Sequence, residues 1–381
     1  MILAFGARNF LSFKEGIDIS LRLNKNCPEY ISKGLDFAST LCVKGNNASG
    51  KSNILQILDF FSYYCINSFG ELKPKDKIPV KSFYFNEDPT ELYLEYFIAK
   101  KSYRYELVVT SEKVISETLF DITAKQSQKV LFIRKNNNVT VPSKNFFSLK
   151  KVRLRDNASI ISTAFQYELE SIIPHYDKIR SIQVDRLMFT PLEEKITFIS
   201  EALEDDDFVF NFVKTQIMDF DTGIIDIELR EKEQEKGEFF PIFFHETEDG
   251  KVTPLFFHEE SKGTQNLFIN LGWYCISLIG GLTLVMDEFD LHLHPHISHA
   301  LVEMFDDPAI NVNNSQFIFT THDIPLMDKM GKYRTFIVNK EYNESYGYRL
   351  DELPTKELEL KNDRPISPYY NTGKLGGVPN L

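Results

Sequence analysis

The feature that most constrains the fold is a glycine-rich motif near the start of the sequence. Its residues fit the pattern G-x-x-x-x-G-K-[S/T] and are Gly45, Asn46, Asn47, Ala48, Ser49, Gly50, Lys51 and Ser52. An apolar run at 39–43 precedes the motif, and a helix-like segment at 53–61 follows it. A strand, a glycine-rich loop and a helix in this order are typical of a phosphate-binding loop, or P-loop. The alternative is an ordinary turn before a helix, but the flanking segments favour the P-loop.

The motif also indicates what the loop would hold. Its glycines let the backbone wrap around a phosphate, and the loop N–H groups and the helix N-terminus offer partial positive charge. In such loops the lysine reaches the β- and γ-phosphates of a nucleotide, and the following hydroxyl binds Mg²⁺. We therefore expect Lys51 to contact the phosphates and Ser52 to be a metal ligand.

Composition excludes several classes of protein. The chain has 381 residues, of which 43% are hydrophobic, so it can form one large or two ordinary domains. Its net charge of −12 does not draw it onto nucleic acid, so any such contact requires a local basic patch. Its four cysteines form no C-x-x-C pair, as expected in a reducing cytoplasm. We find no signal peptide and no apolar run long enough for a membrane span, and expect a cytoplasmic protein without membrane contact.

The order of expected elements predicts an α/β fold. Alternating apolar and polar residues predict a β-rich half of the nucleotide domain at 80–155. Helices are expected at 160–179 and 193–220, and a hairpin joins 224–229 to 239–244. A second parallel α/β block follows, with helices at 263–279 and 295–305 and strands at 282–286, 316–320 and 333–338.

Two acidic residues follow the expected strand at 282–286. Asp287 would hold Mg²⁺ through water, and Glu288 would orient and deprotonate an attacking water. Both tasks need a carboxylate just beyond the carboxyl end of a strand. Most such pairs are only solvated strand ends, but the distance of this pair from the P-loop favours a Walker B motif.

Two further motifs lie where an open α/β sheet binds its ligands. His322 follows the strand at 316–320 and is interpreted as a γ-phosphate sensor; the alternative is a polar loop residue. Ser261 and Gly263 precede the helix at 263–279 and would form another anion-binding helix N-terminus. The alternative for this motif is an ordinary helix cap.

These four motifs, in this order, resemble the head of the ABC/SMC-type ATPases over roughly 1–110 and 255–340. The sequence SKGTQ at 261–265 replaces the transporter-type signature LSGGQ. With NFLSF at 9–13 and LHP at 293–295, the chain looks most like the AAA-type, OLD-like ATPases. Those ATPases are common in bacterial anti-phage systems and overlap with RecF-like repair ATPases. The segment 369–379 resembles the ending of stand-alone members encoded beside a separate effector.

The resemblance implies a fold class, an assembly and a set of ligands. The fold class is an ABC/SMC-type P-loop ATPase head with a β-rich lobe and a helical insertion. Two heads would meet head to tail around ATP and Mg²⁺, which makes the protein a homo-oligomer. Ser261 and Gly263 would close on the γ-phosphate in trans, and Asp290 would be the D-loop residue that crosses the interface. No glutamine stands at the expected Q-loop position; Asn86 is the nearest amide and Gln56 lies on the P-loop helix, so that role is open.

The resemblance also implies a division of labour between proteins. The 59 residues after His322 are too few for the Toprim nuclease domain of OLD proteins, so we expect a separately encoded effector. This chain would then be its sensor or regulator in anti-phage defence. The alternatives are a RecF-like DNA-repair ATPase and a scaffold that holds ATP without turnover. The expected domains are an N-terminal ATPase lobe, a helical and hairpin insertion, a C-terminal ATPase lobe and a tail, at 1–155, 156–255, 256–345 and 346–381.

Two other clusters allow more than one interpretation. The segment 122–155 has nine basic residues and no acid, and would bind DNA or RNA, dock an acidic protein, or form a solvated face. The alternating His292, His294 and His296 suggest metal ligands, but Pro295 favours the first turn of a helix instead.

Overall fold

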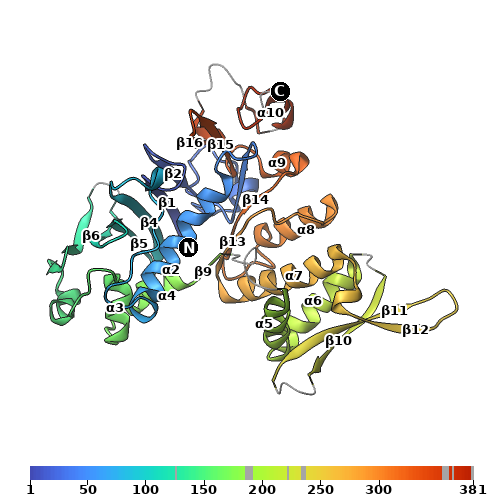
Figure 1. Ribbon diagram of the computed structural model, residues 1–381. Helices are drawn as coiled ribbons and strands as arrows, with labels where there is room; N and C mark the ends of the chain where they lie inside the picture. The colour runs from blue at the N-terminus through green and yellow to red at the C-terminus, as the bar shows by residue number, and fades with distance from the viewer. Residues whose placement is uncertain are drawn as a thin grey trace. The chain divides into compact units, whose positions relative to one another are not determined.

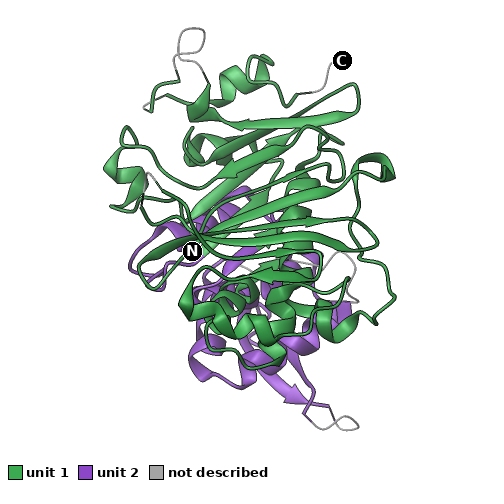
Figure 2. Ribbon diagram, turned by 90° about the vertical axis from the view of Figure 1, so that its left-hand side faces the viewer, with its two compact units in different colours: residues 1–184, 285–287, 316–381 green, residues 185–284, 288–315 purple. Residues whose placement is uncertain are grey.

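The computed structural model describes residues 1–124, 127–184, 192–220, 223–232, 237–353, 360–362 and 364–378. Contacts divide the chain into two compact units, coloured separately in Figure 2. Unit 1 comprises Met1–Val184, Val285–Asp287 and Gln316–Leu381, and unit 2 comprises Asp185–Leu284 and Glu288–Ser315. Among the described residues, no helix is both long and apolar enough to cross a membrane.

The first sheet of unit 1 is the β-rich lobe that the alternating sequence pattern predicts. Within the described residues it has seven strands in the order β2-β1-β4-β5-β6-β7-β8, and neighbouring strands in it pair antiparallel. Alternate side chains of β4 are buried, because successive residues of a strand face opposite sides of the sheet. The strands are β1 (Ile2–Arg8), β2 (Ile17–Ser20), β4 (Thr90–Ile98), β5 (Lys101–Val109), β6 (Val114–Asp121), β7 (Lys129–Lys135) and β8 (Asn138–Thr140).

The second sheet contains the strand that leads into the P-loop. Its order over the described residues is β16-β15-β3-β14-β13-β9. β3 is buried along its whole length and pairs in parallel with β14 and β15, so the carboxyl ends of these strands meet at one edge. The strands are β3 (Thr40–Gly45), β9 (Ile182–Val184), β13 (Thr283–Met286), β14 (Gln316–Thr320), β15 (Thr335–Glu341) and β16 (Glu344–Arg349).

The helices of unit 1 surround a continuous apolar core. The long helix α2 packs against α3 and α4, and Figure 1 shows it beside the strands of the lobe. The predicted helix at 160–179 is two helices, because Glu168 takes a left-handed φ of +53° and α4 starts at Ile173 with Pro174 in its first turn. The helices are α1 (Glu29–Ser32), α2 (Lys51–Glu71), α3 (Ile160–Gln166), α4 (Ile173–Arg180), α9 (Ile324–Met330) and α10 (Ser367–Asn371).

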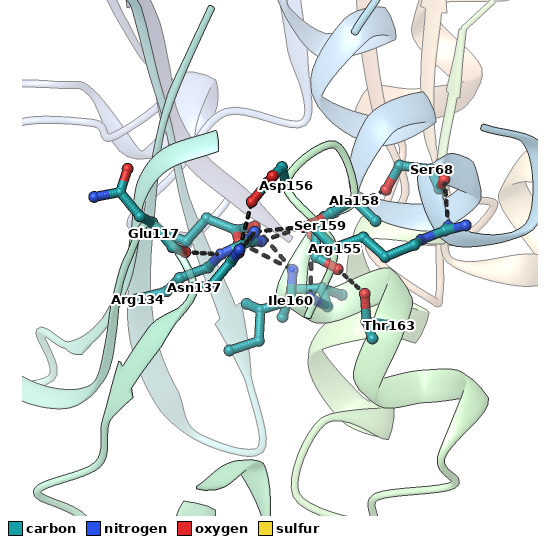
Figure 3. Close-up of polar contacts among 12 residues, drawn as sticks. Ser68, Glu117, Arg134, Asn137, Arg155, Asp156, Ala158, Ser159, Ile160 and Thr163 are labelled. Carbon is teal, nitrogen blue, oxygen red and sulfur yellow. Dashed lines mark hydrogen bonds and ion pairs between the residues drawn. The ribbon is translucent and has the colours of Figure 1, made fainter. Parts of the chain in front are cut away.

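A buried ion pair fixes the lobe to the start of α3 (Figure 3). The side chains of Glu117 on β6 and Arg134 on β7 are both 0% exposed, and Arg134 Nη1 lies 2.7 Å from Glu117 Oε2. Arg134 Nη1 also donates to the carbonyl of Ala158 at 2.6 Å. Glu117 accepts hydrogen bonds from the N–H of Ile160 and the hydroxyl of Tyr105. Every group in this network is therefore paired, as a buried charge requires.

Unit 2 combines helices with a small antiparallel sheet of order β10-β11-β12. The predicted helix at 193–220 is two helices, because Asp206 Oδ1 accepts from the N–H groups of Phe208 and Val209 and caps the second. The predicted hairpin is confirmed as β10 and β11, although 233–236 in its tip lie outside the described residues. The elements are α5 (Leu192–Glu204), α6 (Asp207–Asp219), α7 (Lys262–Gly280), α8 (Pro295–Asp306), β10 (Ile224–Glu231), β11 (Phe239–Glu246) and β12 (Val252–Phe256).

Candidate nucleotide-binding site

The glycine-rich motif forms the loop between β3 and α2, as the sequence predicts. β3 ends at Gly45 and α2 begins at Lys51. Gly50 has a φ of +112°, a conformation that residues other than glycine rarely adopt. At Gly45, an added Cβ would lie 2.5 Å from the carbonyl oxygen of Val338. Both glycines are therefore required by the path of the backbone.

Lys51 lies over this loop. Lys51 is buried, with an exposed fraction of 7%, and its Nζ donates to the carbonyls of Gly45 and Asn46 at 3.1 Å each. The Oγ of Ser49 is buried and has no hydrogen-bond partner among the described residues. A cation and an unsatisfied hydroxyl at a helix N-terminus fit a phosphate group, which accepts hydrogen bonds and carries negative charge.

Side chains distant in sequence hold the loop from outside. The hydroxyl of Ser345 on β16 donates to the carbonyl of Ser49 at 2.6 Å and is hydrogen-bonded to the hydroxyl of Ser12 at 2.8 Å, where Ser12 can donate. Asn53 on α2 donates to the same Ser12 hydroxyl at 2.6 Å. A Cβ on Gly50 would lie 2.7 Å from Ser345 Oγ, so these contacts leave no free space. Ser12 is part of the NFLSF motif at 9–13, but no feature of the sequence marks Ser345 as a neighbour of the loop.

The same NFLSF segment is hydrogen-bonded to residues 83–89, which contain the expected Q-loop position. Asn9 and Asn86 exchange side-chain hydrogen bonds of 2.9 and 2.8 Å. The carbonyl of Asn9 also accepts the hydroxyl of Thr90 at 2.8 Å. The amide of Asn86 is thus hydrogen-bonded to Asn9, and within the described residues its side chain makes no hydrogen bond to the P-loop motif.

Asp287 lies at the same edge of the sheet as the P-loop. It follows β13, and its carboxylate accepts a hydrogen bond from the hydroxyl of Thr320 at the end of β14. Thr320 pairs in register with Val43, two residues before the first glycine of the P-loop. The predicted neighbour Glu288 comes next in the chain with a φ of +47°. Such a conformation is uncommon outside glycine and concentrates at functional sites.

His322 is exposed just after β14, and the residues around it are firmly fixed. Asp323 caps α9 by accepting from the N–H of Leu326 at 3.2 Å. Lys44, the residue before the P-loop motif, donates from Nζ to the carbonyl of Asp323 at 3.1 Å. The segment that carries His322 is therefore tied to the end of β3. Sequence analysis did not foresee this role of Lys44.

The signature residues lie in unit 2 at the start of α7. Ser261 is the N-cap, and its hydroxyl accepts from the N–H of Thr264 at 3.1 Å, so the helix-cap interpretation is confirmed as a structural role. A Cβ on Gly263 would lie 3.1 Å from the carbonyl oxygen of His292. The segment that carries Asp290 thus packs against the signature within this unit. In that segment, the carbonyl of Asp290 accepts from the N–H of Leu293 at 3.0 Å.

The histidine cluster belongs to a helix start. Pro295 is the first residue of α8, as predicted, and His294 caps it by accepting from the N–H of His296 at 3.3 Å. Across the part of the chain that the structure describes, no group of three or more His, Cys, Asp or Glu residues is arranged to hold a metal ion. The geometry therefore favours the helix interpretation of this cluster.

Fewer of the basic side chains at 122–155 are exposed than the sequence suggests. Arg134 is in the buried pair with Glu117, and Arg155 donates to the carbonyls of Ser68 and Phe69. Lys125 lies outside the described residues. The exposed members are Lys129, Lys135, Lys144, Lys150, Lys151 and Arg153.

The sequence and the fold were compared with known proteins. None of the curated proteins matches the sequence. Among solved structures, the chain is similar to an SMC head bound to the C-winged helix domain of ScpA, with TM-score 0.49, 14% identity and coverage of 94% of this chain and 99% of that one. It is also similar to the SMC head domain from Thermotoga maritima, with TM-score 0.44, 13% identity and coverage of 91% and 98%. A third is an Smc head domain with an extended coiled coil bound to the C-terminal domain of ScpA derived from Pyrococcus furiosus, with TM-score 0.46, 14% identity and coverage of 92% and 97%.

A family model described as "AAA domain, putative AbiEii toxin, Type IV TA system" matches residues 41–328. The matched range contains the P-loop motif, Asp287, Glu288 and His322. The antiparallel β-rich lobe and the P-loop sheet give the mixed α/β architecture that the sequence predicts. Because the match extends over more than half of the sequence, the chain belongs to this family of AAA domains.

Proposed function

We propose that this chain binds ATP at the P-loop and hydrolyses it with Mg²⁺. The observation that carries the proposal is the position of the Lys51 ammonium group over the loop that joins β3 to α2. Asp287 lies beyond a strand of the same sheet, hydrogen-bonded to Thr320. A phosphate-binding cation and a carboxylate at one sheet edge are the two parts that nucleotide hydrolysis requires of such a fold.

Each residue would have one task. Lys51 and the loop N–H groups would bind phosphate oxygens, while the Ser52 hydroxyl and the Asp287 carboxylate would hold the metal. ATP and Mg²⁺, when bound, supply the phosphoanhydride bond and the divalent charge. Glu288 would orient a water molecule and accept its proton, and His322 would donate a hydrogen bond toward the γ-phosphate.

Assembly would complete the site. We infer that the signature of a second copy faces the P-loop, with Ser261, Gly263 and Asp290 at the interface. The support comes from unit 2, where α7 begins at the exposed residues Ser261 and Lys262 and Ser261 caps the Thr264 N–H. The first N–H groups of a helix have no intrahelical partner and favour an anion. The segment of Asp290 packs against the same turn, so both parts would reach the interface together.

The biological role that we infer is control of a separately encoded effector in anti-phage defence, in the cytoplasm. The sequence resemblance to OLD-like ATPases supports this role, and the description of the family names a putative toxin and a toxin–antitoxin system. Expressed with its genomic neighbour, the wild-type chain should restrict phage, and Lys51→Ala should remove the protection. Equal restriction by both proteins would contradict a role for ATP in this control.

The RecF-like alternative, a repair ATPase that binds DNA directly, is less well supported. It depends on the basic segment at 122–155, in which Arg134 is buried and the half-buried Arg155 donates to main-chain carbonyls. The net charge of −12 also opposes binding to a polyanion. We therefore keep the effector-control proposal.

Nucleotide binding tests the proposal directly. A fluorescent ATP analogue should bind to the wild type and lose most of its affinity for Lys51→Ala, because the alanine removes the cation that contacts phosphate. Lys113→Ala, which truncates an exposed lysine of the same unit, is the matched control and should bind as the wild type does. A folded Lys51→Ala protein with wild-type affinity would contradict the assignment of the P-loop.

A further inference from the structure

A segment far from the P-loop in sequence docks onto the same sheet. We define the tail segment as residues 366–378, which includes α10. Ile366, Tyr370 and Leu375 share a buried apolar cluster with Met327 and Ile337. The carboxylate of Asp328 on α9 accepts hydrogen bonds from the N–H groups of Ile366 and Ser367 at 2.5 and 2.7 Å. The tail segment is thus a packed part of unit 1.

Gly377 of the tail segment lies close to the first glycine of the P-loop. A Cβ added to Gly377 would lie 3.4 Å from the Cα of Gly45 and 2.9 Å from Cε2 of Tyr370. The φ of Gly377 is +70°, a conformation that side chains rarely adopt. Gly45 also approaches β15, because a Cβ added to it would lie 2.5 Å from the Val338 carbonyl oxygen. Gly45 is therefore close to both β15 and the tail segment.

Hydrogen bonds fix Gly377 in this position. Asn339 Oδ1 accepts from the N–H of Gly377 at 2.6 Å. The hydroxyl of Tyr370 donates to the carbonyl of Gly377 at 2.7 Å. Tyr348 donates to the carbonyl of Leu375 at 2.9 Å. Both backbone polar groups of Gly377 are thus satisfied by side chains, which a loosely attached segment would not achieve.

Lys44 extends this contact toward the segment that carries His322. Its side chain is only 2% exposed, and Nζ lies 5.7 Å from the centroid of the Tyr370 ring while it donates to the Asp323 carbonyl. An ammonium group over an aromatic face is attracted to it. The tail segment therefore contacts the residue before the P-loop motif as well as the first residue of that motif.

We propose that the tail segment is a positioning element of the P-loop, and that Gly377 is the residue through which it acts. The inference rests on the proposed ATP-binding function and deepens it. Displacement of Gly377 would free Gly45, whose carbonyl accepts the Lys51 ammonium group at 3.1 Å. The affinity for nucleotide, and the rigidity of the empty loop, would then depend on whether the tail segment is docked.

Two glycines of the tail segment provide a matched pair of variants. Gly377→Ala adds a methyl group 2.9 Å from Tyr370, 3.3 Å from Ile337 and 3.4 Å from Gly45, whereas Gly373→Ala, at a similar φ of +73°, adds one that meets only Val378 at 3.3 Å. Both carry the same kind of backbone strain, so their difference reports the displacement of Gly377 from Tyr370, Ile337 and Gly45. The affinity for a fluorescent ATP analogue should fall about tenfold in Gly377→Ala, which is about 1.4 kcal/mol, and stay near that of wild type in Gly373→Ala.

A second measurement needs no nucleotide. Hydrogen exchange of the amides at 46–51 should be faster in Gly377→Ala than in Gly373→Ala, because the loop loses its support. Asn339→Ala removes the acceptor of the Gly377 N–H without adding atoms, and should act in the same direction if Gly377→Ala does not fold. Equal exchange and equal affinity in the two glycine variants would overturn the proposal. Failure of wild type to bind the analogue, with faster exchange in Gly377→Ala, would contradict only the proposed function.

Discussion

Replacement of Arg134 by methionine should destabilise the protein severely. The guanidinium group has four strong partners, because besides Glu117 it donates to the carbonyls of Asn136, Arg155 and Ala158 at 2.6, 2.7 and 2.6 Å. Methionine has a similar volume but no donor, so it would leave a buried carboxylate without its counter-ion. Loss of one partner from a buried ion pair costs about 3–5 kcal/mol, compared with about 5–15 kcal/mol for the total stability of a domain.

Two further variants separate the ion pair from the general effects of substitution. Lys135→Met changes the next residue of β7, which is exposed, and should shift stability by less than about 0.5 kcal/mol. The double variant Glu117→Leu with Arg134→Met removes both charges, and should therefore be more stable than Arg134→Met by itself. Measured with Glu117→Leu by itself as the fourth protein of the cycle, the coupling between the two substitutions should be about 0.5–3 kcal/mol, the range for contacting residues.

Urea unfolding followed by far-UV circular dichroism is the appropriate assay. The fluorescence of the single tryptophan is unsuitable, because Trp273 lies on α7 in unit 2, whereas the ion pair lies in unit 1. The change in the unfolding midpoint, multiplied by the slope, gives the difference in free energy of unfolding. Arg134→Met within 1 kcal/mol of wild type, or a double variant less stable than Arg134→Met, would refute this account of the pair.

Three other expectations concern the site, the fold and the surface. Lys51→Ala and Ser261→Arg should each lack hydrolysis but recover part of it when mixed, and no recovery in verified mixed oligomers would contradict a site shared between copies. Burial lowers the pKa of His175 from 6.5 to about 4. As the pH drops from 6.5 to 4, the unfolded state is therefore protonated before the folded state, and the free energy of unfolding should fall. In urea titrations, His175→Leu should flatten this pH dependence. If the exposed basic residues bind duplex DNA, the double variant Lys150→Glu with Lys151→Glu should reduce the slope of log affinity against log salt by about 0.9 per lost contact. The affinities are measured by fluorescence anisotropy. An unchanged slope would exclude these two lysines from the contact with DNA.

Local patterns in the sequence were sufficient for much of the fold. The P-loop and the strands of the lobe were predicted because each depends on residues close in the chain. The two helix breaks were missed, although four acidic residues at 204–207 interrupt the apolar pattern around Asp206. One break depends on the side-chain cap of Asp206 and the other on the left-handed φ of Glu168, and neither follows from the spacing of apolar residues.

The supports of the site could not be predicted, because they join residues far apart in sequence. Ser345 reaches Ser49 across 296 positions, and nothing in the sequence around Ser345 marks it as a partner of the loop. Gly377 was included only in a resemblance between chain endings, which did not indicate that it lies against Gly45. Arg134 shows the opposite error, since a basic residue in an acid-free segment was assigned to the surface although its partner, Glu117, lies 17 positions earlier.

The rate of ATP hydrolysis by the Glu288→Gln protein tests the central claim most directly. Glutamine keeps the shape of the side chain but cannot accept a proton, so nucleotide affinity should persist while turnover with Mg²⁺ falls about 10²–10⁴-fold. The measurement is phosphate release at saturating ATP, with affinity determined on the same preparation. A rate within about threefold of wild type, with affinity unchanged, would contradict the assignment of Glu288 as the base and with it the proposed mechanism.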